Sequence, residues 1–185
     1  MKLNLGCGHR KLAGYVNVDQ APECAPDLVC DLEQFPWPWP TDSIETVTFC
    51  HSLEHLGAEV RVFKGIMQEL YRVCRPGATI AIQVPHPRHD DFINDPTHVR
   101  AITVGTMSLF SKKANEEWRT LGAANTPLGV HWNVDFEIQR VEMGLAEPYH
   151  SRMASGELTQ EQVFELVQQR NNVVKELRLL LVAVK

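Results

Sequence analysis

The sequence predicts an α/β fold with a mostly parallel sheet, helices on both faces of the sheet and an antiparallel C-terminal strand. Two observations support this prediction. Segments 45–52, 60–74 and 79–84 read as strand, helix and strand with turn residues between them, which is typical of a parallel sheet with crossover helices. Upstream, short apolar segments end at glycine or aspartate, where a turn would begin.

The regular elements follow from apolar spacing and end signals. Apolar residues recur at helical spacing from Val60 to Cys74, and the Arg-Pro-Gly segment 75–77 ends that helix. Thr159 and Gln162 form a capping-box pattern, so a second helix extends to about residue 171. The expected strands are 3–6, 15–19, 27–32, 45–52, 79–84, 132–145 and 176–184.

Two stretches are expected to be irregular. In segment 35–43, prolines flank Trp37 and Trp39; since proline fixes φ and removes a donor, we expect an exposed, stiff loop. Its tryptophans could stack on a ligand, but packing against the sheet edge is more common. Segment 85–130 is rich in His, Pro, Asp and Asn, with a short helix expected around 103–113.

Composition limits the function classes. The 185 residues fit one domain, 1–185, and a net charge of −5 without a basic run argues against a nucleic-acid partner. The five cysteines are odd in number and form no CxxC pair, which favours a reducing compartment over a disulfide framework. No apolar run approaches the ~20 residues of a membrane helix, and no secretory signal is visible. We therefore expect a cytoplasmic protein without membrane contact.

A glycine loop near the start points to a cofactor. Gly6 and Gly8 follow the first expected strand, and Asp19 ends the second. Glycines let backbone N–H groups approach a ligand, and an acid in this place can bind both hydroxyls of a ribose. The dinucleotide fingerprint GxGxxG fails because Lys11 occupies its third glycine position. A cofactor without phosphates fits better; the alternative is a tight turn with a surface aspartate.

An ordered set of motifs resembles class I S-adenosylmethionine-dependent methyltransferases: "LNLGCG", Asp19, "DL" at 31–32, "LEHL" at 53–56 and "ELYRVCRPGA" at 69–78. The resemblance covers about residues 3–84 and implies a Rossmann-like three-layer sandwich that binds S-adenosylmethionine. By this resemblance the cofactor contacts are Gly6, Cys7 and Gly8 at the methionine moiety, Asp19 at the ribose, Asp31 with Leu32 at the adenine, and Cys50, His51 and Ser52 near the methyl group.

The chain departs from the family pattern at two places. The third loop glycine is absent, and no helical extension precedes the first strand. We therefore expect a more open cofactor site, or one covered by a second subunit in a homodimer.

The histidines leave several readings open. "HSLEH" (51–55) also fits the H-x-x-E-H pattern of zinc peptidases; because His51 falls at the end of an expected strand, we do not favour zinc hydrolysis and expect no metal site. Local pairing of Glu54 and His55 in a turn is the simpler reading. Loop 85–100 should overhang the active site, where Asp95 can orient His98.

The expected function is methyl transfer to a small molecule or glycan. His51, His86 and His98 are the candidate bases, needed only if the acceptor is a hydroxyl or a protonated amine. We expect loop 85–100 to form part of the acceptor site; a loop held only by its own Asp–His hydrogen bonds is the alternative, and a divalent-metal site in it is the least favoured reading because no regular ligand spacing supports one. A non-catalytic subunit that binds S-adenosylmethionine is the alternative function.

Overall fold

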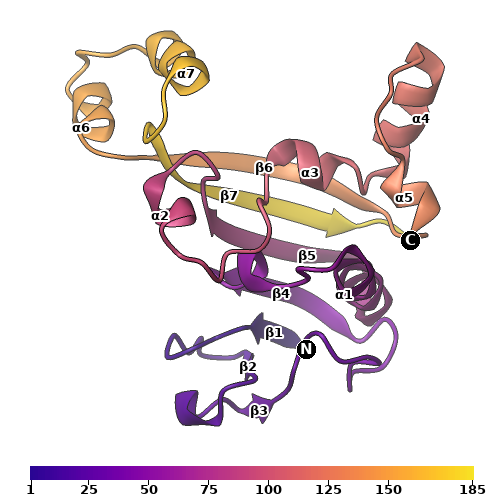
Figure 1. Cartoon of the computed structure of the whole chain (residues 1–185). Coiled ribbons are helices and arrows are strands. Elements are labelled where there is room, and N and C mark those ends of the chain that lie inside the picture. The colour runs from indigo at the N-terminus through magenta and orange to yellow at the C-terminus, as the bar shows by residue number, and fades with distance from the viewer.

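The computed structural model describes residues 1–185 and contains one seven-stranded sheet of order β3-β2-β1-β4-β5-β7-β6 (Figure 1). Neighbouring strands from β3 to β5 pair in parallel, whereas β7 is antiparallel to both β5 and β6. The predicted α/β class, a mostly parallel sheet with an antiparallel C-terminal strand, is confirmed. The strands are Lys2–Leu5 (β1), Val16–Asp19 (β2), Leu28–Val29 (β3), Ile44–Cys50 (β4), Cys74–Pro85 (β5), Phe136–Leu145 (β6) and Val174–Ala183 (β7).

The two predicted long helices are present. One is α1, and the other is α7, which begins with the predicted capping box of Thr159 and Gln162. The short helix expected around 103–113 is α3, and the structure adds four helices that the sequence did not predict. The helices are Val60–Val73 (α1), Asp90–Ile93 (α2), Val104–Ser108 (α3), Lys112–Leu121 (α4), Leu128–His131 (α5), Tyr149–Ala154 (α6) and Gln160–Gln169 (α7), with 3-10 turns at Pro22–Cys24 (η1) and Leu53–His55 (η2). None of these helices combines the length and apolar character needed to cross a bilayer.

A single hydrophobic core lies on one face of the sheet. Paired side chains of adjacent strands, such as Leu5 with Phe49 and Phe49 with Ile82, point to this face and are fully or almost fully buried. Phe63 and Leu70 of α1 belong to the same core. The core therefore links β1, β4 and β5 to the crossover helix and rests on apolar burial.

The opposite face of the sheet is only half-buried. Thr48, Ala81 and Leu180 are paired across β4, β5 and β7 and alternate with core residues. Next to them, Arg140 of β6 is exposed. We expected helices on both faces; the connections from β1 to β4 contain no α-helix, only η1 and loops, so the helical layer expected on this face is not formed.

The tryptophan loop between β3 and β4 differs from expectation in one respect. It is irregular as predicted, but Trp37 and Trp39 are buried and stack edge to face with ring centroids 5.9 Å apart. The Arg72 guanidinium of α1 donates to the carbonyl oxygens of both tryptophans. The loop is thus packed against α1 and is less exposed than predicted, while its aromatic rings belong to the core, in line with the more common packing reading.

Candidate functional site

The strand order places a binding site between β1 and β4. From β1 the chain moves outward to β2 and β3, then returns to β4 on the other side of β1. In open α/β sheets, ligands bind beyond the carboxyl ends of the strands at such a reversal. The glycine loop follows β1 directly, and His51 and Ser52 follow β4. The chain reversal therefore brings both predicted segments to one sheet edge.

The first glycine of the loop is required by close packing. Gly6 has a φ of +66°, and a Cβ at this position would overlap the Cβ of Ser52. The buried Ser52 hydroxyl donates to the carbonyl oxygen of Leu5 at 2.8 Å. Gly6 therefore lets the loop after β1 pass directly against the end of β4.

Asp19 is held at the end of β2 by backbone donors. Its Oδ2 accepts from the Gly8 N–H at 2.7 Å, and its Oδ1 accepts from the Ala21 N–H at 3.0 Å. Each carboxylate oxygen keeps a further lone pair. The aspartate thus fixes the glycine loop and can still accept hydrogen bonds from a ligand.

These residues line a cleft of about 490 Å³, a size within the usual range for small-molecule sites. Most of the predicted cofactor residues meet there, including Asp31 and Leu32. Cys7 and Cys50 are the exceptions, since neither lines the cleft. Cys7 is buried, and its N–H donates to the Val18 carbonyl oxygen, whereas the Cys50 thiol accepts from the Arg10 guanidinium at 2.8 Å. The lining consists of Gly6, Gly8, Asp19, Gln20, Cys30, Asp31, Leu32, His51, Ser52, His55, Leu56 and Thr97.

A second cleft of about 420 Å³ adjoins the first, because His51 and His55 line both. Its walls are almost entirely polar and include Asp91 and Asp95 of the segment after β5 and Glu176 of β7. Loop 85–100 therefore overhangs this cleft, as its position after a parallel strand predicts.

His51 stands at the junction of the two clefts. Its φ of +53° lies in the left-handed region, which is uncommon for residues other than glycine and concentrates at functional sites. Nδ1 lies 3.6 Å from Glu54 Oε1, and Nε2 lies 3.6 Å from Glu176 Oε2. These distances are too long for hydrogen bonds. The Glu54 and Glu176 carboxylates nevertheless raise the pKa of His51, against partial burial, which lowers it.

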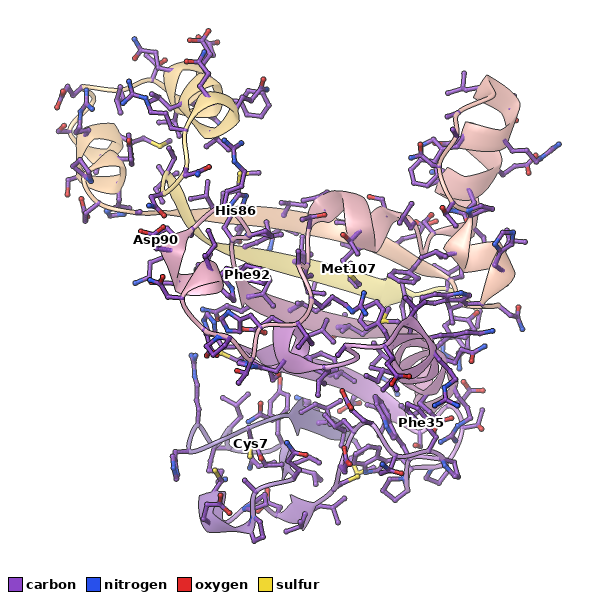
Figure 2. All side chains as sticks on the ribbon, in the orientation of Figure 1. Cys7, Phe35, His86, Asp90, Phe92 and Met107 are labelled. Atoms are coloured by element: carbon purple, nitrogen blue, oxygen red, sulfur yellow. The ribbon has the colours of Figure 1, made fainter.

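His98 also reaches the second cleft, but His86 lines neither cleft. His98 Nε2 is 3.8 Å from Asp95 Oδ2, as the spacing suggested, and its ring stacks on Phe92 with centroids 5.2 Å apart. The His86 ring accepts from the Arg88 N–H, and burial lowers its pKa. Figure 2 shows His86 near Asp90, far from Cys7 of the glycine loop. The structure thus brings together two of the three predicted bases.

The zinc-peptidase reading of 51–55 is wrong. That motif needs both histidines on one helix face, but His51 follows β4 in a left-handed conformation and only Leu53–His55 form a 3-10 turn. The prediction from the sequence missed Glu54 and Thr97 as parts of the site. Glu54 reads as a surface acid in a turn, and only the fold shows that it is buried.

Comparison with known proteins gives fold similarity only. No family model matches the chain, and no curated protein does. Solved structures match over nearly its whole length. One is a SAM-dependent methyltransferase from Archaeoglobus fulgidus (TM-score 0.65, 15% identity, 98% of this chain and 85% of that chain). Another is a SAM-dependent methyltransferase from Mesorhizobium loti (TM-score 0.53, 16% identity, 98% of this chain and 89% of that chain). A third solved structure, described as a SAM-dependent methyltransferase from Methanosarcina mazei, matches with a TM-score of 0.56 and 12% identity over 99% of this chain and 92% of that chain. The chain has the fold of class I S-adenosylmethionine-dependent methyltransferases.

Proposed function

We propose that this chain binds S-adenosylmethionine in the cleft beside Gly6, Gly8 and Asp19 and transfers its methyl group to a polar small molecule or glycan in the adjoining cleft. The observation that carries the proposal is the convergence of the glycine loop, Asp19 and Asp31 on one cleft at the β1–β4 reversal. The similarity to solved methyltransferases supports the same cofactor.

The residues present fit this cofactor. Gly8 has open space at the position of a Cβ, and it lines the cleft, so a ligand can approach the loop backbone. Asp19 would hold the ribose hydroxyls and Asp31 the adenosine end, with Leu32 as the apolar contact. When bound, the cofactor supplies a methyl group on a positively charged sulfur.

The chain contributes alignment and shielding. Methyl transfer is an in-line displacement with a good leaving group, and correct alignment of reactants can contribute up to ~7–11 kcal/mol. His51 lies where the two clefts meet, beside the acids Glu54 and Glu176, so it is placed to orient an acceptor at the methyl end of the cofactor cleft.

The second cleft favours a polar acceptor. None of its nine lining residues is hydrophobic, and they include acids, histidines and Lys175. Such a lining offers many hydrogen-bond partners to hydroxyl groups. The net charge of −5 argues against a polyanion such as RNA or DNA.

The test is calorimetry with S-adenosylhomocysteine, the demethylated product. Asp19→Ala should weaken binding by about 1.5–3 kcal/mol, the usual contribution of a hydrogen bond to a charged group. Glu23→Ala removes a nearby exposed acid that does not line the cleft and should leave the affinity unchanged. Absence of binding by the wild type would refute the function, and equal affinity in Asp19→Ala would remove Asp19 from the site. Binding without turnover on any acceptor would instead support a non-catalytic subunit.

A further inference from the structure

Glu54 is a buried acid without a hydrogen-bond partner. Its side chain is 1% exposed, and neither carboxylate oxygen has a hydrogen-bond partner. Burying an ionised carboxylate without compensation costs several kcal/mol, so such a group normally faces a cation or a donor. The nearest charged side chain, His51, stops at 3.6 Å. The carboxylate is therefore available to a ligand in the second cleft.

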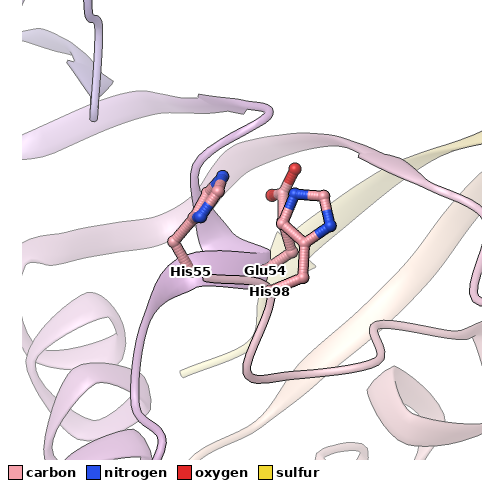
Figure 3. A group of neighbouring side chains, drawn as sticks. All are labelled: Glu54, His55 and His98. Carbon is pink, nitrogen blue, oxygen red and sulfur yellow. The ribbon is translucent and has the colours of Figure 1, made fainter. Parts of the chain in front are cut away.

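Two histidines face the same space. Glu54, His55 and His98 each offer one ligand atom, and these atoms lie within 4.8 Å of one another. Figure 3 shows the three side chains projecting together from η2 and from the segment after α2. The three ligand atoms border one space, and the set of two imidazoles and one carboxylate is known from transition-metal sites with open positions.

Hydrogen bonds fix both imidazoles in the form that a metal requires. His98 Nδ1 donates to the Phe92 carbonyl oxygen at 2.8 Å, which leaves the Nε2 lone pair free. His55 Nδ1 lies 2.9 Å from Thr97 Oγ1. Since the Thr97 hydroxyl donates to the Asp95 carboxylate at 2.6 Å, it accepts from His55, whose Nε2 is likewise free. Ligating histidines characteristically donate their other N–H in this way.

The backbone holds the ligands together. The N–H groups of Val99 and Arg100 both donate to the Glu54 carbonyl oxygen at 3.0 Å, which docks the segment after α2 onto η2. The Arg100 guanidinium also lies over the Phe63 ring, 4.0 Å from its centroid. The cluster is therefore preorganised across two parts of the chain that are distant in sequence.

We propose that Glu54, His55 and His98 bind one divalent transition-metal ion such as Zn²⁺, Mn²⁺, Fe²⁺ or Co²⁺, whose open positions hold an oxygen of the methyl acceptor. Imidazole ligands disfavour Mg²⁺ and Ca²⁺, which take oxygen ligands. The role of the ion in transfer rests on the proposed function. The acceptor hydroxyl, bound to the ion, loses its proton to solvent water. Its oxygen then bonds to the methyl carbon as the carbon–sulfur bond breaks, and that electron pair stays on sulfur.

The binding experiment uses the full chain after treatment with a chelator. Co²⁺ and Zn²⁺ are titrated, with binding followed by calorimetry and by the visible absorption of Co²⁺. We expect one ion per chain and affinity for Mg²⁺ at least about 100-fold weaker. Glu54→Gln and His98→Ala should each lower the Co²⁺ affinity at least about 100-fold. His150→Ala, which removes an exposed histidine elsewhere, should bind as the wild type.

Two further measurements separate the possible failures. The melting temperature of metal-free Glu54→Gln should match or exceed that of the wild type, because the variant removes a buried charge that has no hydrogen bond, while added Zn²⁺ should raise only the wild-type melting temperature. Acetohydroxamate, an oxygen chelator, should change the Co²⁺ spectrum by occupying the open positions; an unchanged spectrum refutes the acceptor role. Absence of Co²⁺ and Zn²⁺ binding, or equal affinity in the two variants, overturns the metal site. Binding of S-adenosylhomocysteine to the same samples tests the proposed function separately.

Discussion

Replacing the loop glycines one at a time separates three effects that the structure assigns to them. Gly6, Gly8 and Gly14 all have positive φ angles, of +66°, +49° and +79°. An alanine at any of them costs about 1–2 kcal/mol in the left-handed region. At Gly14 nothing lies within 4 Å of the added Cβ, so Gly14→Ala should lose only this amount. At Gly6 the Cβ overlaps Ser52, which adds about 1–3 kcal/mol of overpacking.

Gly6→Ala should therefore be less stable than Gly14→Ala by about 1–3 kcal/mol. Urea denaturation followed by circular dichroism measures the difference, which corresponds to roughly 2–12 °C in melting temperature for a chain of this size. Gly8→Ala should match Gly14→Ala in stability, since its Cβ also meets open space, but it should weaken binding of S-adenosylhomocysteine because Gly8 lines the cleft. Equal stability of Gly6→Ala and Gly14→Ala would refute the proposed packing of Gly6 under Ser52.

Two further predictions concern stability and reactivity. Arg72 and the Trp37 N–H hold the pKa of Glu69 below its usual range. The ionised Glu69 therefore stabilises the folded chain fully above about pH 4.3, and this stabilisation is lost as the pH falls through the lowered pKa. Glu69→Ala should lower the free energy of unfolding by about 1.5–3 kcal/mol at pH 7. In urea denaturation at acidic pH, the difference between the variant and the wild type should shrink. A difference that does not depend on pH would contradict the role of the ionised Glu69. Burial raises the pKa of the Cys74 thiol to about 12, so iodoacetamide at pH 8 should label Cys74, as read by mass spectrometry, only after denaturation. Labelling in the folded chain would show that this strand end opens.

The sequence predicts those elements whose signals are local. The apolar spacing of residues 60–74 predicts α1, and its buried side chains, including Phe63 and Leu70, lie at that spacing. By contrast α4 buries a single residue, Asn115, so it carries no apolar periodicity to detect. For the segment 35–43 the prolines predict an irregular backbone, but they do not show how deeply the loop packs, so the burial of Trp37 and Trp39 is seen only in the fold.

The candidate site was predictable in part for a related reason. Gly6, Gly8, Asp19 and Asp31 stand at strand ends, and parallel strands carry such positions to one edge. The grouping of Glu54 with His98 depends instead on backbone hydrogen bonds between distant segments, which no local pattern encodes. From the sequence Glu54 is expected only to pair locally with His55 in a turn, and its burial is a property of the fold.

The half-buried sheet face makes the fold unequally tolerant of sequence change. Along β4 and β5, residues such as Phe49 and Ile82 fill the core, while their neighbours Thr48 and Ala81 keep contact with solvent. The need to fill the core therefore constrains the side chain at every second position of these two strands. The intervening positions can drift or be redesigned, for example to introduce a spectroscopic label or a surface for immobilisation. That freedom lies on the face opposite α1, away from the core that holds the fold together.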